Sequence, residues 1–169
     1  APGPAHGRGE VYRGGTGEWV GDDVRQVMEG IAVRDSFLEY KAEFGRSLVC
    51  AYANMAGRKV GIVANQRLAS KTARGELQIG GVIYHDSADK AARFVMDCNQ
   101  TGLPLVFFQD VQGFMVGKDA EQHGIIRSGP QLVNAASNPP VPKTTILRGP
   151  PFVARHSALC PLLVTDDVL

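Results

Sequence analysis

The chain has 169 residues, 44% of them hydrophobic and 21% charged, which is enough for one sizeable core and most simply one domain. Its 18 basic and 17 acidic residues give a net charge of +1, so no excess positive charge favours nucleic acid or an anionic membrane. No apolar run reaches membrane-spanning length. Cys50, Cys98 and Cys160 have spacings that fit neither a disulfide framework nor a Cys-x-x-Cys metal site, which indicates a reducing compartment.

The first half of the chain predicts an arm, a short helix and a hairpin. Residues 1–17 are rich in Gly, Pro and Ala and predict a disordered arm or linker, followed by a partial domain at 18–169. Asp22 and Asp23 cap a predicted helix with an apolar face formed by Val24, Val27, Met28 and Ile31. Strand candidates follow at 37–40, 47–53 and 60–64, and the last two form an antiparallel hairpin across a turn at 55–59. Residues 67–81 predict a loop.

The second half alternates helices with buried strands. Asp86 or Ser87 caps a helix that ends at Asn99, with Cys98 in the core and an apolar face of Ala88, Ala91, Ala92, Val95 and Met96. A buried strand is predicted at 103–108 and another strand at 143–147. Between them, a helix over 119–136, interrupted by Pro130, buries Ile125, Ile126, Leu132, Val133 and Ala136. The repeated order of strand, strand and helix favours an α/β ββα spiral, although a doubly wound parallel sheet predicts a similar string.

A buried strand, a glycine turn and a helix start meet at residues 110–121. Gly113 and Gly117 allow a sharp turn and close approach of a ligand to the backbone, and Asp119 opens the helix. Free N–H groups at a helix start favour negative charge. The pattern predicts a site for an anion or a developing oxyanion, and an ordinary strand-to-helix turn is the alternative interpretation.

Charged side chains elsewhere indicate no second site. The separations of the histidines match no metal-ligand motif, so no metal site is predicted at His85, His123 or His156. Solvated charges are the interpretation for Lys90, Arg93 and Lys118.

Several motifs in a fixed order carry a family resemblance between residues 22 and 147. They are Gly61-Ile62-Val63-Ala64-Asn65-Gln66, the helix at 90–98, the strand and turn at 104–117, and the run from Gly124 to Lys143. The chain resembles the carboxyltransferase (β) subunit of biotin-dependent acyl-CoA carboxylases. Gly-Phe-Met-Val-Gly at 113–117 is most similar to the 3-methylcrotonyl-CoA carboxylase branch. Decarboxylase subunits of biotin-dependent sodium pumps share a similar motif order.

The resemblance implies a partial crotonase-like (ClpP-like) ββα superhelix. It places the chain at the beginning of the C-terminal half, which receives carboxybiotin from a partner carrier domain of the biotin carboxylase and carrier subunit. The N-terminal half of a neighbouring subunit then supplies the acyl-CoA site, in a homo-oligomer of the bacterial cytoplasm or mitochondrial matrix. Backbone N–H groups, rather than side-chain nucleophiles, stabilise the oxyanions in such an enzyme. The implied catalytic positions are Gly113, Phe114 and Ala154, and the implied biotin-binding positions are Gly113, Gly117, Phe152 and Ala154.

The last segment departs from the family pattern. Val153 and Arg155 occupy glycine positions of an aromatic-Gly-Ala-Gly segment, where they resist positive φ and fill the space that biotin needs. The isolated chain is therefore predicted to be inactive. One alternative is a crotonase-like fragment that only binds or oligomerises, and another is the decarboxylase subunit of a sodium pump. A hydratase or isomerase on the same fold needs a carboxylate pair that the sequence does not reveal.

Overall fold

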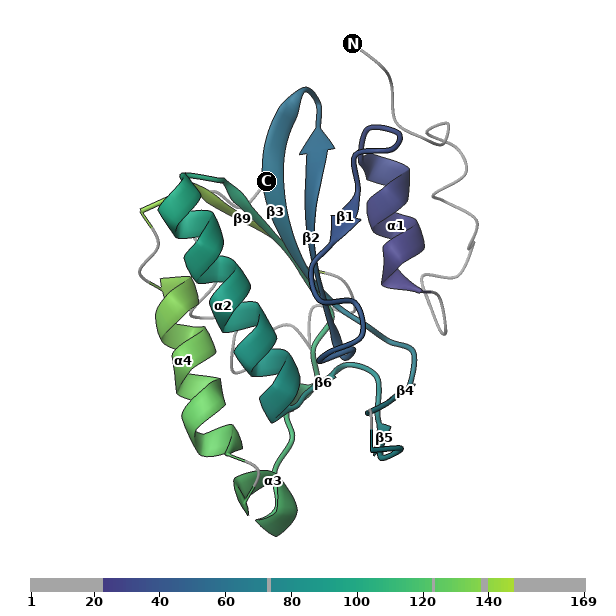
Figure 1. Cartoon of the computed structure of the whole chain (residues 1–169), viewed down its shortest axis with the longest axis vertical. Coiled ribbons are helices and arrows are strands. Elements are labelled where there is room, and N and C mark those ends of the chain that lie inside the picture. The colour runs from purple at the N-terminus through teal and green to yellow at the C-terminus, as the bar shows by residue number, and fades with distance from the viewer. Residues whose placement is uncertain (1–22, 73, 123, 138–139, 148–169) are drawn as a thin grey trace.

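The structure is a computed structural model that describes residues 23–72, 74–122, 124–137 and 140–147 (Figure 1). The predicted arm at 1–17 and the departing segment at 152–155 lie outside these residues.

The first sheet has five strands in the order β1-β2-β3-β7-β9. They are β1 (Leu38–Glu39), β2 (Leu48–Met55), β3 (Arg58–Asn65), β7 (Leu105–Gln109) and β9 (Lys143–Leu147). The predicted hairpin is confirmed, because β2 pairs antiparallel with β3 around Ala56 and Gly57, both at positive φ. From β3 onward the sheet is parallel, with Val63 opposite Phe107 and Phe107 opposite Thr145.

A second, two-stranded sheet runs alongside the first. It pairs β6 (Val82–Ile83) in parallel with β8 (Gly113–Phe114). The helices that follow are α2 (His85–Thr101), then α3 (Lys118–Gln122) and α4 (Ile125–Ser137). Each repeat therefore places one strand in each sheet before its helix, which is the predicted ββα spiral. A doubly wound sheet, whose strands all lie in one sheet, does not describe this chain.

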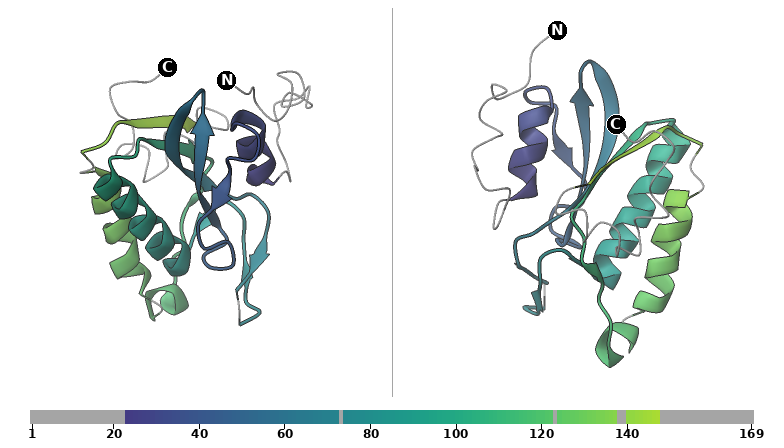
Figure 2. Two further views of the ribbon diagram at one scale, coloured as in Figure 1. Left: turned by 45° about the horizontal axis from the view of Figure 1, so that its top comes forward. Right: turned by 180° about the vertical axis from the view of Figure 1, so that it is seen from behind.

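Two cores lie on opposite faces of the first sheet (Figures 1 and 2). Helix α1 (Val24–Ile31) covers one face with the buried side chains of Val24 and Met28. Helices α2 and α4 cover the other face, where Cys98 is buried as predicted. A Cβ atom at Gly61 of β3 would lie only 2.5 Å from the Cys98 sulfur, so glycine lets α2 approach the sheet closely.

Three sequence predictions about the elements are wrong. The loop at 67–81 contains two short antiparallel strands, β4 (Ser70–Lys71) and β5 (Leu77–Gln78). The helix predicted over 119–136 is divided into α3 and α4 at Gly124, where φ is +92°, and α4 continues through Pro130. Ile126 and Met96 were predicted to be buried but are 68% and 52% exposed, because both lie on the outer surface of the helix pair.

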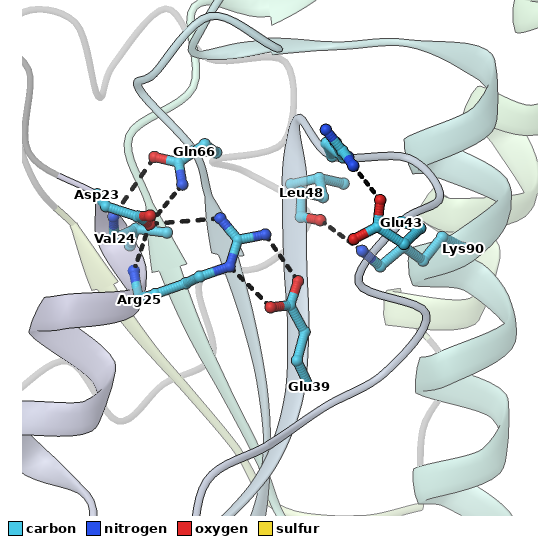
Figure 3. A network of polar contacts seen from close by, with 9 residues as sticks. Asp23, Val24, Arg25, Glu39, Glu43, Leu48, Gln66 and Lys90 are labelled. Carbon is cyan, nitrogen blue, oxygen red and sulfur yellow. Dashed lines mark hydrogen bonds and ion pairs between the residues drawn. The ribbon is translucent and has the colours of Figure 1, made fainter. Parts of the chain in front are cut away.

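Lys90 was interpreted as a solvated charge, and this too is wrong. Its side chain is fully buried in α2, and its Nζ atom donates to the carbonyl oxygen of Leu48 at 3.0 Å (Figure 3). Burial lowers the pKa of the Lys90 ammonium from its usual value because it disfavours the charged form.

Candidate functional site

Gly113 and Phe114 lie in strand β8, at the edge of the second sheet among the described residues. The Gln112 N–H donates to the Gly81 carbonyl oxygen and the Met115 N–H to that of Ile83, each at 2.8 Å. Consecutive N–H groups of an extended strand point to opposite sides. Gln112 and Met115 are three residues apart and yet both donate to the β6 segment, so the strand departs from regular alternation at Gly113, where φ is +152°. The backbone N–H groups of this irregular edge are candidate donors of the kind that stabilise an oxyanion.

Gly113 and Gly117 leave open space at this edge. Their φ angles are +152° and +130°, a region that side-chain-bearing residues rarely adopt. A Cβ atom added at either position would meet no atom within 4 Å. Glycine is therefore required by backbone conformation and not by crowding, and the adjacent space remains open to a ligand.

The predicted helix start contributes less to the candidate anion site than the sequence suggested. Helix α3 begins at Lys118, next to the predicted Asp119. It has only five residues and ends before Gly124, where φ is +92°. So short a helix aligns few peptide dipoles. The candidate anion site is therefore a strand edge rather than a helix N-terminus.

The aromatic ring of Phe114 anchors β8 to α4. A Cβ atom at Gly129 would lie 3.5 Å from the Phe114 ring, which is ordinary van der Waals contact, so the ring packs directly against α4 at this position. The structure thus brings Gly113, Phe114 and Gly117 together on one segment. Phe152 and Ala154, the other predicted site residues, lie outside the described residues.

The sequence analysis missed the residues that brace this segment. Arg67 Nε lies 3.3 Å from the Asp110 carboxylate, and the Asp110 N–H donates to Asn65 Oδ1 at 3.2 Å. Gly80 and Gly81 pass between these strand ends, and the Gly81 N–H donates to the Gln66 carbonyl oxygen. The available signal was a Gly-Gly pair directly before two apolar residues.

A second polar network fixes α1 to the sheet (Figure 3). Gln66 Nε2 donates to the Asp23 carboxylate at 2.6 Å, and Arg25 donates through two nitrogens to Glu39 at 2.7 and 2.9 Å. Burial acts to raise the pKa of the Asp23 carboxyl group, but the bonds from the Arg25 N–H and from Gln66 outweigh it and hold the pKa below its usual value. This network joins structural elements, and its Gln66 also accepts the Gly81 N–H through its backbone carbonyl oxygen.

Within the described part of the chain, no group of three or more His, Cys, Asp or Glu side chains is placed to hold a metal ion. Among those same residues, no helix is both long and apolar enough to cross a membrane.

Solved structures with the same arrangement establish the fold class. The β subunit of geranyl-CoA carboxylase from P. aeruginosa is 34% identical, with a TM-score of 0.62 over 73% of this chain and 21% of that one. The transcarboxylase 12S hexamer, solved with methylmalonyl-coenzyme A and methylmalonic acid, is 40% identical, with a TM-score of 0.64 over 74% of this chain and 23% of that one. The two-sheet spiral is therefore a crotonase-like carboxyltransferase fold.

Sequence relatives identify the family. The uncharacterized carboxylase YngE of Bacillus subtilis is 42% identical over 125 residues, which are 74% of this chain and 23% of that protein. The mitochondrial methylcrotonoyl-CoA carboxylase beta chain of Dictyostelium discoideum is 37% identical over 138 residues, 82% of this chain and 21% of that protein. Residues 18–169 match the carboxyl transferase domain, and the chain belongs to this family. It spans less than a quarter of the length of these relatives.

Proposed function

We propose that this chain is the part of an acyl-CoA carboxylase carboxyltransferase that receives carboxybiotin, with 18–169 as part of the C-terminal domain. The observation that carries the proposal is the irregular β8 edge, where the backbone at Gly113 and Gly117 has positive φ and borders open space.

The residues at this edge fit the ureido group of biotin. When bound, biotin on its carrier domain supplies the carboxyl group. The Phe114 N–H would donate to the ureido oxygen of bound biotin, which would become negative as the carboxyl group leaves. Gly113 and Gly117 allow a planar ring to approach the backbone without meeting a side chain. A preorganised donor of this kind contributes most in the transition state, where the oxygen carries most charge. Phe152 and Ala154 complete the proposed site.

The partners follow from the same assignment. The biotin carboxylase and carrier subunit delivers the carboxyl group, and the N-terminal half of a neighbouring subunit in a homo-oligomer binds the acyl-CoA. Relatives named as biotin-dependent carboxylase subunits, and the related transcarboxylase 12S hexamer, support this arrangement. The bacterial cytoplasm or the mitochondrial matrix is the proposed location, supported by relatives named as mitochondrial. These relatives are carboxylases and a transcarboxylase, which favours a transferase over a sodium-pump decarboxylase or an inactive binding module.

The variant Gly113→Val tests the site. It is made in a carboxyltransferase with both halves, whose C-terminal half includes the sequence of this chain. Gly113→Val should reduce biotin-dependent carboxyl transfer by roughly 10²-fold or more, because the shifted backbone misaligns the oxyanion donor. Assembly, followed by size-exclusion chromatography, should be unchanged. Gly57→Val is the matched control, since Gly57 also has positive φ and open surroundings but lies at the far hairpin. An unchanged transfer rate in Gly113→Val contradicts the proposal.

A second test addresses the chain by itself. The 169-residue protein should show no free-biotin-dependent decarboxylation of malonyl-CoA, because the acyl-CoA site belongs to another half and because Val153 and Arg155 obstruct biotin. Glycine at both positions should raise biotin affinity at most, without turnover. Turnover well above that of Gly113→Val would show that one half suffices.

A further inference from the structure

Arg67 holds a fixed place beside the β8 edge. It follows β3 at the carboxyl end of the parallel strands, where open α/β sheets commonly bind ligands. Its Nε atom pairs with the Asp110 carboxylate at 3.3 Å, and the two side chains are 31% and 14% exposed. Asp110 is itself held through its backbone by Asn65. The guanidinium is therefore oriented before any ligand arrives.

The outer end of this guanidinium is free to bind. A guanidinium has a side edge, which includes Nε, and an end edge formed by its two Nη atoms. Asp110 contacts the Nε atom, and among the described residues neither Nη atom has a hydrogen-bond partner. Nη1 lies 3.3 Å from the point where a Cβ atom would stand on Gly81. The missing side chain at Gly81 leaves the end edge uncovered.

Backbone contacts connect this end edge to the proposed oxyanion donor. The Gly81 carbonyl oxygen accepts the Gln112 N–H at 2.8 Å, and Gln112 directly precedes Gly113. The Gln112 Cγ atom also lies 3.6 Å from the same Cβ position on Gly81. Arg67 therefore borders the turn on which the Phe114 donor is carried.

We propose that the end edge of Arg67 binds the carboxylate of the group being transferred and so distinguishes carboxybiotin from biotin. This inference rests on the proposed function. A planar guanidinium offers two parallel N–H donors that match the two oxygens of a carboxylate. Asp110 already neutralises part of its charge, which suits a monoanion that must be released rather than a more highly charged phosphate.

Carboxylate binding is tested first on the 169-residue chain, without any reaction. Acetate is titrated while the guanidinium NMR signals of Arg67 and Arg58 are followed, with neutral acetamide as the matched probe. Arg58 is an exposed arginine at the opposite end of β3 and reports non-specific ion effects. We expect a saturable shift of Arg67 with acetate alone. A shift no larger than that of Arg58, or one that acetamide reproduces, overturns the proposal.

The second test uses the two-half carboxyltransferase carrying this segment, with Arg67→Met against Arg58→Met. Arg67→Met should raise KM for carboxybiotin about tenfold, the loss expected for a partly exposed charged hydrogen bond. The inhibition constant of biotin, which lacks the carboxylate, should not change. If Arg67→Met weakens the binding of carboxybiotin and of biotin equally, Arg67 only shapes the turn at Gly113 and does not bind the carboxylate. If the unsubstituted protein has no turnover but Arg67 still binds acetate, the proposed function fails and carboxylate binding stands.

Discussion

A Cβ atom added at Gly80 would collide with the carbonyl oxygen of Arg67, far inside van der Waals contact. The segment that leads into β6 therefore crosses directly over the end of β3. This crossing sets the position of β6, and through the Gly81–Gln112 bond it also sets the position of β8. The proposed oxyanion edge thus depends on a residue in a stretch that sequence patterns suggested was a loop.

Alanine at Gly80 should be strongly destabilising. The added methyl group meets backbone atoms that cannot rotate away, so we expect a loss of roughly 1–3 kcal/mol or more in the free energy of unfolding. Gly75→Ala is the control, because Gly75 has a φ of +85° but no atom within 4 Å of its Cβ position. That substitution should cost only about 1 kcal/mol of backbone strain. Urea unfolding of both variants measures the difference, and equal losses would contradict the steric explanation.

The cap of α1 should give the protein an acid-sensitive contribution to stability. The pKa of Asp23 is lower in the folded protein than its usual value of 3.8. Its charged form therefore stabilises the fold above pH 3.8, and this contribution disappears as the pH falls through the folded pKa. Asp23→Asn keeps a capping oxygen without the charge. It should be less stable than the unsubstituted chain at pH 7, and the gap in unfolding free energy should close as the pH falls through the folded pKa of Asp23.

Methionine at Lys90 should stabilise the protein at neutral pH. The buried ammonium costs free energy that its bond to Leu48 does not fully offset, so we expect a gain of roughly 1–3 kcal/mol. The folded pKa of Lys90 lies below the model-peptide value of 10.5. The cost is thus fully present below the folded pKa and fades as the pH rises toward 10.5. Thermal unfolding at pH 7 and pH 10 tests this, and a less stable variant at pH 7 would show that the Leu48 bond dominates.

The thiols of Cys50 and Cys98 should react only when the protein opens. Burial raises the pKa of each to about 12, and both side chains are fully buried. Iodoacetamide labelling followed by mass spectrometry should therefore be far slower in the folded chain than in the urea-unfolded chain at the same pH. Rapid labelling of the folded chain at pH 9 would be evidence against this burial.

The sequence was informative where a pattern repeats over many residues. The hairpin of β2 and β3, the length of α2 and the buried strand β7 all follow from periodic apolar residues. Strands β6 and β8 have only two residues each, which is too short for any periodicity. The sequence places Lys90 in solvent because its charge favours water, and only the tertiary structure supplies the Leu48 carbonyl oxygen that accepts its hydrogen bond.

The same limit applies to the candidate site. Positive φ at Gly113 and Gly117 could be anticipated from glycine in a turn. The Arg67–Asp110 pair could not, because its two residues follow different strands and meet only after β3 and β7 pair in parallel. The break between α3 and α4 was also assigned to the wrong residue, since Pro130 was the stronger local signal and Gly124 the actual one.

The two sheets grow together along the chain. In the described residues each ββα unit adds a strand to the first sheet, and two units each add one to the second. A unit is therefore buried by its neighbours in the chain, as in a solenoid. The free energy of unfolding should then depend mainly on the contacts between adjacent units. Among the described residues, β8 pairs only with β6, whereas β3 is paired on both sides. Amide exchange should therefore be faster in β8 than in β3, which places the proposed site on one of the less protected strands.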